Sequence, residues 1–585
     1  MFTKQLPGSL LKASLFLTFF LVPCGQTNGQ FGTIFNVPPD PDPMVIGTDT
    51  QLNVFAGGEI GEGFIAGNPN GSSTNVQVNI FGGVVGDFFT AHPNTEINLM
   101  GGFVGSDLSA DGVVLNISGD VLLGGDNVIP SFVSFLSNST INIFDDAQVR
   151  NLDLENCDLN MWGGSVMGGF DFSGVSPASV KVSNSSVNVF GGDFGTAGFD
   201  VSKIRVFEEG YANYFGGNIG VNHVHDGGTI NIFDDANVFL VVLRPELPGV
   251  EKPTLNMFGG FIDDLSLGNI NSPNQSDAVG SQAFLYDGAV DIVRLSPTLD
   301  GPKRVVVNGV SVQVRVSSSG SGFDELVQIL NGSVECLRSG TSEIFGGSIE
   351  KHTGFGDDSL YGSEFQLLDV ATGQIIEDVT PNIQFGVPYV LEERDVILRA
   401  VLADGTSYQH ELKTFAPGIF NPNSLTLHLS QELTPSSFQV IRGTQTGGGL
   451  PELASSDDQR LSLQPGFTLN SSEPPVWFTT ELNTPVSAPT NLRLMIEANV
   501  STPNLAQIVE VWNWNTGAFE KPIDYDFEAN FLTDRLRVYD LTDRISDFVE
   551  PGTGNVRTRT GWKADGFVLG FPWTVNVDRI TLSTN

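Results

Sequence analysis

The chain has 585 residues, of which 67 are Asp or Glu and 28 are Lys or Arg, so its formal net charge is −39. A surface this acidic repels a phosphate backbone, and we therefore expect no nucleic-acid partner. The content of 40% hydrophobic and 10% aromatic residues excludes a chain that is disordered throughout. The 68 Gly and 31 Pro residues favour an all-β chain with many turns.

The first residues are typical of an export signal. Lys4 and Lys12 precede an apolar run over residues 15–22 that is too short for a membrane anchor. We therefore expect a signal peptide at 1–29, a secreted or cell-surface protein, and no transmembrane segment in the mature chain. Residues 30–49 are rich in Pro and Asp and predict a linker or cap.

A short motif then recurs through residues 50–360, for example as "VNIFGG" at 78–83 and "LNMFGG" at 255–260. Its asparagine recurs at steps of 18 to 28 residues, at Asn53, Asn79, Asn98, Asn116, Asn142, Asn160, Asn188, Asn213, Asn231 and Asn256. Degenerate copies continue at Phe284, Val305, Gln328 and Glu343. A constant strand with variable steps predicts a β-solenoid, in which insertions leave each coil as loops.

The motif alternates in the manner of a strand, with aliphatic residues on one face and Asn with a bulky apolar residue on the other. Because stacked coils lie about 4.8 Å apart, we expect the Asn side chains to hydrogen-bond along the axis. The bulky residues should stack likewise, at Phe55, Phe81, Met100, Phe144, Trp162, Phe190, Phe215, Phe233 and Phe258. The sequence leaves open whether this column faces inward or outward. The Gly-Gly pair that follows permits a corner with positive φ.

The pattern changes twice after the solenoid. Residues 361–420 include "VILRAVLADGTSYQHEL", two strands around a turn, and predict terminal coils with a cap. Residues 421–585 lack the asparagine column and contain alternating strands such as "SLTLHLS" and "QIVEVWNWNTGAFE", a hairpin over "NTG". We therefore predict an all-β protein with a right-handed parallel β-helix followed by an antiparallel β-sandwich. Cys157 and Cys336 would lie many coils apart, too far for a disulfide.

Several of these strings resemble a known group of proteins. They are "NVPPDPDPMVIGTDTQLNVFAGG", the "NIFGG" repeats, "LADGT", "RGTQTGGGLPELASSDDQRL", "VWNWNTGAFE" and "RTRTGWKADGFVLGFPWTVNVDRI". Together they look like the secreted β-solenoid proteins of planctomycete bacteria that carry a C-terminal β-sandwich. The resemblance covers nearly the whole mature chain and implies export and the two-part architecture, but it transfers no catalytic residues. The "FDD" corners and the weaker coils after 280 depart from it.

Two of the corners carry Asp in place of Gly. Asp145 and Asp146 form one "FDD" corner, and Asp120 aligns one coil below Asp146. Clustered carboxylates are the ligands that Ca²⁺ prefers, so these three residues are a candidate metal site. The other reading is that they are polar turn residues, in which case the protein needs no cofactor.

A second group combines cations, bases and acids in a chain with few cations. The expected register places Arg205 beneath His223 and Glu208 beneath Asp226, with His225 on the same face as His223. A polysaccharide lyase needs a cation to neutralise a carboxylate and a base to take a proton. The region 203–228 is therefore a candidate catalytic face, and an ordinary solenoid surface is the alternative.

The sandwich offers a candidate binding site. Trp512 and Trp514 lie two residues apart and share one face of the hairpin strand, where they would form a sugar-binding platform or part of the core. No nucleophile elbow, zinc-protease or nucleotide-binding motif occurs in the sequence. We expect a non-enzymatic scaffold or adhesion-type protein with a polysaccharide or a cell-surface matrix as its partner. The alternative is a polysaccharide lyase or hydrolase acting at residues 203–228.

Overall fold

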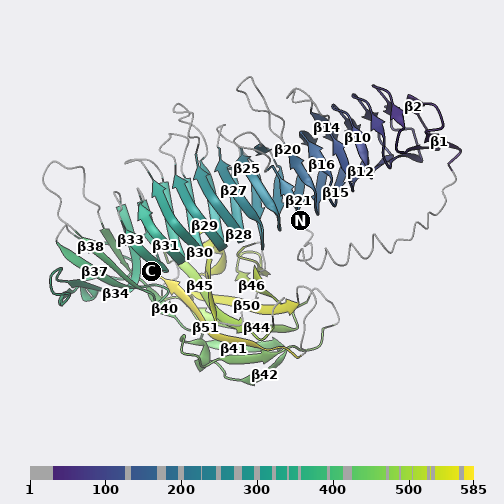
Figure 1. Cartoon of the computed structure of the whole chain (residues 1–585). Helices are drawn as coiled ribbons and strands as arrows, with labels where there is room; N and C mark the ends of the chain where they lie inside the picture. Colours follow the sequence, from purple (N-terminus) through teal and green to yellow (C-terminus); the bar gives the residue numbers. More distant parts are fainter. Residues whose placement is uncertain are drawn as a thin grey trace. The chain divides into compact units, whose positions relative to one another are not determined.

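The structure is a computed structural model (Figure 1). It describes residues 31–124, 133–167, 180–195, 203–207, 209–225, 227–244, 252–268, 280–295, 303–318, 325–338, 341–352, 357–391, 395–412, 425–468, 473–485, 489–502, 505–523, 527–528, 534–564 and 572–585. The described residues are nearly all in strands and turns, which confirms the all-β prediction. No helix in these ranges is long and apolar enough to cross a membrane.

The chain divides into two compact units. The amino-terminal unit contains the described residues up to Arg304, and the carboxy-terminal unit contains Val305–Val316 and Glu325–Asn585. This division differs from the boundary predicted at 420/421. The last coils of the solenoid belong to the same compact unit as the sandwich, because side chains of the sandwich pack directly on them.

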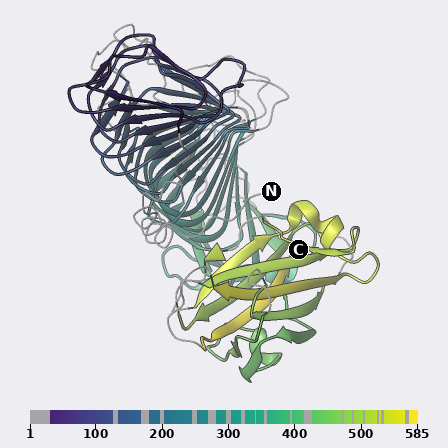
Figure 2. The same ribbon diagram turned by 90° about the vertical axis from the view of Figure 1, so that its right-hand side faces the viewer.

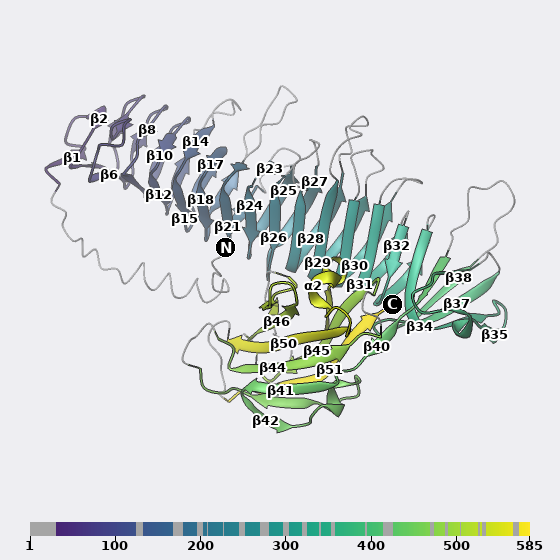
Figure 3. The same ribbon diagram turned by 180° about the vertical axis from the view of Figure 1, so that it is seen from behind.

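The amino-terminal unit is a parallel β-helix whose coils lie over one another (Figures 1 and 2). Its first sheet, which we call the ladder sheet, contains the asparagine motif (Figure 3). The strands of the ladder sheet are β1 (Thr33–Val37), β3 (Thr50–Val54), β6 (Val76–Ile80), β9 (Thr95–Leu99), β12 (Val114–Ile117), β15 (Thr140–Ile143), β18 (Asp158–Met161), β21 (Ser186–Val189), β24 (Tyr211–Tyr214) and β26 (Thr229–Ile232).

Two further sheets complete each coil. The second sheet contains β4 (Glu59–Ile60), β7 (Val84–Val85), β10 (Gly102–Val104), β13 (Val121–Leu123), β16 (Gln148–Arg150), β19 (Ser165–Met167) and β22 (Asp193–Phe194). The third contains β2 (Val45–Ile46), β5 (Ile65–Ala66), β8 (Thr90–Ala91), β11 (Ser109–Asp111), β14 (Ser134–Ser137), β17 (Leu152–Glu155), β20 (Val180–Ser183) and β23 (Lys203–Val206). Throughout the described strands of these sheets, successive coils pair in parallel, as the motif predicts.

Towards the later coils, the corners that separate one sheet of a coil from the next are lost, and the strands on either side of a corner become one continuous strand. β25 (Asn218–Val224) and β27 (Asn237–Leu243) each continue both the second and the third sheet. The later coils are single long strands, β28 (Thr254–Leu267), β29 (Ser281–Leu295), β30 (Lys303–Ser318) and β31 (Glu325–Arg338).

The alternation along each ladder strand fixes what the solenoid buries. In β12, Leu115 and Ile117 are fully buried, Asn116 is partly buried and Val114 is exposed. The aliphatic residues therefore form the core, and the asparagine lies on the outer face of the sheet. The bulky residue two positions after each asparagine shares that outer face, so the aromatic column faces outward.

Glycine is required at the corner that follows the ladder strand. Gly192 has φ of 89°, and a Cβ atom there would lie 2.5 Å from the backbone oxygen of Gly164 in the coil below. A side chain at this position is excluded both by the positive φ and by the close approach of the coils. At one of the "FDD" corners Asp145 adopts the positive φ instead, at 55°.

The carboxy-terminal unit begins with the last coils. β32 (Thr341–Ile344) and β33 (Ser348–His352) pair in parallel with β31, and β34 (Asp357–Leu368) pairs in parallel with β32. The cap then adds antiparallel strands to β34. Its elements are β35 (Ile375–Asp378), the 3₁₀ helix η1 (Thr380–Asn382), β36 (Tyr389–Leu391), β37 (Val396–Leu402), β38 (Ser407–Leu412) and β39 (Leu425–Leu429). The predicted hairpin around the "ADG" turn is confirmed as β37 and β38.

One strand predicted in the sandwich belongs to the cap. "SLTLHLS" contains β39, which pairs in parallel with β34 and antiparallel with β36. Its alternating pattern is equally suitable for either sheet, so the strand pattern does not distinguish between the cap and the sandwich. The sandwich therefore starts one strand later than predicted, at β40 (Gln431–Leu433).

The sandwich consists of two antiparallel sheets. The first has the order β42 (Thr444–Gly447), β43 (Leu461–Gln464), β51 (Val575–Thr584), β45 (Leu492–Val500) and β49 (Arg535–Asp540), with β40 also on β51. The second has the order β41 (Ser437–Arg442), β44 (Val476–Asn483), β50 (Asn555–Ala564), β46 (Leu505–Asn513) and β47 (Ala518–Glu520), with β48 (Phe527–Glu528) on β46. Short helices η2 (Pro451–Leu453), η3 (Thr542–Arg544) and α2 (Ile545–Phe548) lie in the connections.

Sandwich side chains dock on the last coils within the carboxy-terminal unit. The guanidinium carbon of Arg493 lies 3.2 Å from the ring centroid of Phe345, and only 3% of Arg493 is exposed. Asn308 donates a hydrogen bond of 2.6 Å to the backbone oxygen of Val538. Neither contact follows the solenoid repeat.

Cys157 and Cys336 are free thiols, as predicted.

Candidate functional site

The outer face of the second sandwich sheet carries an unusual set of side chains. In β50 the buried side chains are Val556, Thr558, Thr560 and Trp562. Arg557 and Arg559 alternate with them and point to the opposite face, where they are half-buried. Neighbouring strands contribute aromatic rings to this face. We call the set Trp477, Trp512, Trp514, Phe519, Arg557 and Arg559 the aromatic–arginine face.

The predicted hairpin positions its aromatic residues. β46 and β47 pair with Trp512 opposite Phe519, and Gly517 in the turn has φ of 67°. The rings of Trp512 and Trp514 are 6.3 Å apart at an interplanar angle of 76°, and Trp512 and Phe519 are 5.0 Å apart at 77°. The two indoles lie on one side of the hairpin as predicted, but they are not coplanar. They form a corner rather than a flat platform, and both are only half-buried.

Two arginines occupy positions over these rings. The guanidinium carbon of Arg557 lies 5.7 Å from the ring centroid of Trp512 and 5.5 Å from that of Trp514. The guanidinium carbon of Arg559 lies 4.2 Å from the centroid of Phe519 and 4.8 Å from that of Trp477. These are cation–π distances, so the aromatic rings hold the guanidinium groups in place.

Each arginine also pairs with a carboxylate on a neighbouring strand. Arg557 Nη2 is 3.0 Å from Glu481 Oε1, and the two side chains are 35% and 40% exposed. Arg559 Nε donates to Glu510 Oε2 at 2.7 Å. Exposed ion pairs of this kind contribute little to stability. The pairs do fix the donors and acceptors beside the indoles.

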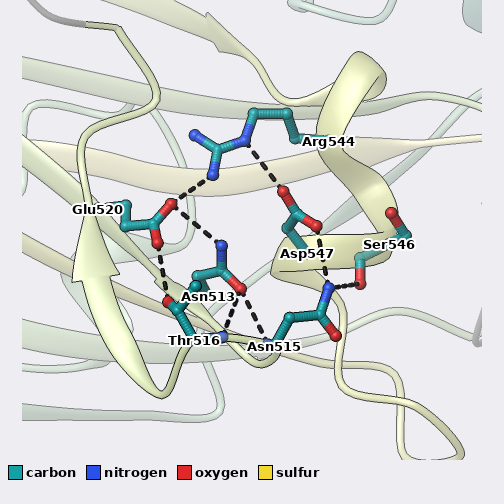
Figure 4. Close-up of polar contacts among 7 residues, drawn as sticks. All are labelled: Asn513, Asn515, Thr516, Glu520, Arg544, Ser546 and Asp547. Carbon is teal, nitrogen blue, oxygen red and sulfur yellow. Dashed lines mark hydrogen bonds and ion pairs between the residues drawn. The ribbon is translucent and has the colours of Figure 1, made fainter.

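A polar network holds the hairpin turn that follows Trp512 and Trp514 (Figure 4). Asn513 Oδ1 accepts hydrogen bonds from the backbone N–H groups of Asn515 and Thr516 at 2.8 and 3.1 Å. Asn515 Nδ2 donates to Asp547 Oδ1 at 3.0 Å, and the backbone N–H of Trp514 donates to the backbone oxygen of Asp547 at 2.7 Å. The turn is thereby attached to α2, which restricts the position of Trp514.

Glu520 is the acceptor at the centre of the same network. It accepts from Asn513 Nδ2 at 3.0 Å and from Thr516 Oγ1 at 2.8 Å, and it pairs with Arg544 (Figure 4). These hydrogen bonds, led by the one from Asn513, lower the pKa of Glu520 to about 2. Glu520 is therefore ionised at any physiological pH and acts here as a structural acceptor, not as an acid.

The sequence reasoning missed the arginines of this site. "RTRTG" places Arg557 and Arg559 two residues apart, the same spacing as Trp512 and Trp514. The same spacing of two cations occurs in β23, at Lys203 and Arg205, and in β49, at Arg535 and Arg537. The spacing alone therefore does not single out β50, nor does it say which strand lies beside the hairpin.

The candidate catalytic residues of the solenoid have the predicted register. Arg205 pairs with His223 on the next strand, and the Phe207 and His225 rings stack at 4.3 Å. His223 and His225 are, however, only 4% and 6% exposed. They lie on the outer face of the sheet, because Asn222 and Val224 point into the core, but both side chains are covered from solvent. Glu208 and Asp226, the predicted acids of this group, lie outside the described residues.

The candidate metal residues of the solenoid are surface residues. Asp120, Asp145 and Asp146 are all exposed at corners. In the part of the chain that the structure describes, they do not form a group whose ligand atoms are close enough to share an ion. Among the described residues, the carboxylates whose oxygen atoms do lie close enough are Asp458, Asp534 and Asp578, in the sandwich.

The asparagine ladder is continuous. Each Asn side-chain N–H₂ group donates to the side-chain oxygen of the Asn one coil below, over 2.8 to 3.2 Å. The ladder begins one coil earlier than the sequence reasoning proposed, because Asn36 accepts from Asn53 at 2.9 Å. At the carboxy-terminal side Gln328 Nε2 donates to Glu343 Oε2 at 2.6 Å, so amide-to-acid pairing replaces the ladder there.

The aromatic column beside the ladder is a stack of parallel rings. Phe144 and Trp162 have centroids 4.8 Å apart, and Phe215 and Phe233 have centroids 4.7 Å apart, with interplanar angles of 4° and 8°. The faces of the rings are covered by their neighbours. Since a sugar ring binds an aromatic residue through the face, this column is a structural element and not a glycan-binding stripe.

Fold and surface together define the class of the protein: a parallel β-helix joined to a β-sandwich that carries an aromatic–arginine face. No protein family and no curated protein matches the chain. Several solved structures match weakly. A xylanase 10C mutant from Cellvibrio japonicus in complex with xylopentaose is 14% identical, with a TM-score of 0.17. The match covers 26% of this chain and 27% of the xylanase, about a quarter of each.

Two other solved structures show similarly weak likeness. SGBP-B from a complex xyloglucan utilization locus in Bacteroides uniformis is 8% identical, with a TM-score of 0.17. The match covers 38% of this chain and 73% of the SGBP-B chain. The enzymatically active domain of tailspike protein 4 from bacteriophage CBA120 is 11% identical, with a TM-score of 0.17. The match covers 92% of this chain and 64% of the tailspike chain. Scores this low carry no argument about function.

Proposed function

We propose that the protein is an exported, non-enzymatic scaffold that binds polysaccharide through the aromatic–arginine face of its sandwich. The observation that carries the proposal is the placement of Arg557 over two half-buried indoles, Trp512 and Trp514, with Glu481 beside it. This arrangement combines apolar faces with a fixed donor and a fixed acceptor on one surface.

Each part of that surface matches a part of a sugar. The C–H groups of a pyranose ring pack on an aromatic face, and its hydroxyl groups bind charged donors and acceptors strongly. The angle of 76° between Trp512 and Trp514 is unsuited to a flat crystalline surface. It suits a single glycan chain that turns between two contact points. Arg557 would also bind the carboxylate of an acidic sugar.

The solenoid has a mechanical role in this proposal. Its coils are joined by parallel strand ladders, by the asparagine ladder and by stacked aromatic rings, and each of these contacts links a coil only to its neighbours. Such a stack resists bending and serves as a spacer at a cell surface or in a matrix. The signal-like residues 1–29 support export.

The enzymatic alternative receives less support. A lyase base must reach a proton on its substrate. His223 and His225 are buried, so neither ring is presented to a polysaccharide. We therefore do not propose the face near residues 203–228 as a catalytic site.

Binding measurements on the purified protein test the proposal. Retention on a panel of neutral and acidic polysaccharides, followed by isothermal titration with oligosaccharides of the retained type, should show binding. Trp512→Ala and Trp514→Ala should each weaken it at least about tenfold, since each removes an aromatic contact of about 1.4 kcal/mol or more. Phe467→Ala is the matched control, because Phe467 is 84% exposed in the same sandwich and lies outside the face.

Two outcomes would reject the proposal. One is glycan binding that both tryptophan variants retain in full. The other is release of unsaturated or shortened sugars during incubation, which would show that the protein is an enzyme. The reaction mixtures should therefore be analysed for products as well as for binding.

A further inference from the structure

Three carboxylates from distant parts of the sequence converge on the first sandwich sheet, one of them in its central strand β51. Asp458 lies in the loop before β43, Asp534 directly precedes β49, and Asp578 lies within β51. One oxygen of each lies within 4.8 Å of the others. Oxygens bound to a common Ca²⁺ at about 2.3–2.6 Å have separations of this size.

Asp578 gives an independent indication of a ligand. Only 2% of this residue is exposed, and its Oδ1 atom has no hydrogen-bond partner. Its Oδ2 atom accepts a long bond of 3.3 Å from the N–H group of Asp458. A buried carboxylate oxygen without a partner is costly, so such atoms call for a bound ion or water. The pKa of Asp578 is raised, first by burial and then also by Asp534.

The charges around this group are unbalanced. Arg460 pairs with Asp458 at 2.6 Å and also with Asp534. Glu497 adds a fourth carboxylate that interacts electrostatically with both Asp578 and Asp534. Arg579 interacts electrostatically with Glu497 but also pairs with Glu432 at 2.8 Å. The group therefore retains an excess of negative charge that a divalent cation would neutralise.

We propose that Asp458, Asp534 and Asp578 bind a Ca²⁺ ion that fastens the loop before β43 to β49 and β51. The donors are all oxygen atoms, which favours Ca²⁺ over Zn²⁺, whose sites use His and Cys. The open, irregular arrangement favours Ca²⁺ over Mg²⁺, which requires a near-octahedral shell. The ion is structural, since the site lies on the other sheet from the aromatic–arginine face.

Arg460 competes with the ion in this proposal. Its guanidinium group bridges Asp458 and Asp534, and its side chain is 29% exposed, so it can swing out when Ca²⁺ binds. Removing this competing charge should strengthen calcium binding. A site in which Arg460 is the permanent counter-ion would behave in the opposite way, because its loss would only destabilise the loop.

Calcium titration of the full chain tests the site. After treatment with EDTA, isothermal titration with CaCl₂ should show one binding event, and saturating Ca²⁺ should raise the melting temperature by at least about 3 °C. Asp578→Asn should abolish both effects. In EDTA this variant should melt no lower than the wild type, because it removes a buried negative charge that lies beside two other carboxylates and leaves an oxygen to accept from the Asp458 N–H group. That control separates loss of the site from loss of the fold.

Two further variants complete the experiment. Arg460→Gln should bind Ca²⁺ about tenfold more tightly than the wild type, and Asp145→Asn, an exposed solenoid carboxylate, should bind as the wild type does. The proposal is overturned if the wild type shows no calcium-dependent heat or shift in melting temperature. It is equally overturned if Asp578→Asn binds as tightly as the wild type, or if Arg460→Gln binds more weakly. None of these readouts depends on a glycan.

Discussion

At the scale of single residues, the asparagine ladder shows how a polar side chain can join the coils of an apolar stack. Asn188 donates to Asn160 Oδ1 at 3.0 Å and accepts from Asn213 Nδ2 at 2.9 Å, and it is 9% exposed. Its donor and acceptor are both used within the ladder. The interaction depends on identical residues at identical positions, because only the direct stacking of coils brings the amides together.

Removing a central rung should therefore cost more than removing the last one. Asn188→Ala leaves one acceptor on Asn160 and one donor on Asn213 without a partner, and we expect a loss of about 2–4 kcal/mol in unfolding free energy. Asn256→Ala, the control, loses only its bond to Asn231 and should cost about 1 kcal/mol. Urea unfolding followed by far-ultraviolet circular dichroism measures both. Equal losses in the two variants would contradict the ladder as a cooperative contact.

At the scale of elements, the corners decide how closely the coils approach. At six of the described corners the second glycine of the pair has a positive φ, and a Cβ atom added there would meet a backbone oxygen of the coil below: Gly83, Gly102, Gly164, Gly192, Gly217 and Gly260. The sequence identifies these corners because glycine recurs at one place in each repeat. It does not reveal that Asp145 takes the left-handed conformation at its corner, since Asp is tolerated but not required there.

We expect the stability of the protein to be sensitive to substitution of the corner glycine. In Gly192→Ala the new Cβ atom would lie 2.5 Å from the Gly164 oxygen at a φ of 89°, and we expect a loss of about 3 kcal/mol or more. Gly47→Ala is the matched control, because a Cβ atom at Gly47 has nothing within 4 Å and its φ is not positive. Thermal unfolding followed by circular dichroism should show a lower transition for the first variant alone.

At the scale of the whole molecule, the last coils and the sandwich form one compact unit. Arg493 of the sandwich is almost fully buried against Phe345 and also lies 5.8 Å from the Tyr361 ring centroid. Arg493 Nε lies 3.9 Å from Asp540 Oδ1, and Arg493 Nη2 donates a hydrogen bond of 3.2 Å to Asn491 Oδ1. The contact with the coil adds a cation–π interaction in a dry environment, which replaces part of the hydration that Arg493 loses.

Loss of this contact should loosen the carboxy-terminal unit. Arg493→Ala removes both the stacking and the packing of the side chain, with an expected cost of about 2–4 kcal/mol. Arg442→Ala is the control, because Arg442 pairs with Glu473 at a more exposed position and should cost less than about 1 kcal/mol. Urea unfolding followed by tryptophan fluorescence measures this unit, since all but one of the six Trp residues lie within it. An unchanged midpoint in Arg493→Ala would show that the contact is incidental.

The sequence by itself determined the solenoid. Its alternating strands, the register of Arg205 with His223 and the continuity of the asparagine column follow from repeat spacing, because parallel stacking places equivalent positions of successive coils over one another. Tertiary structure alone decided the rest. Arg557 lies beside Trp512, Asp578 beside Asp458, and Arg493 against Phe345, across separations that no period describes. In an antiparallel sandwich the order of strands depends on how two whole sheets pack, and alternation within one strand does not specify its neighbour.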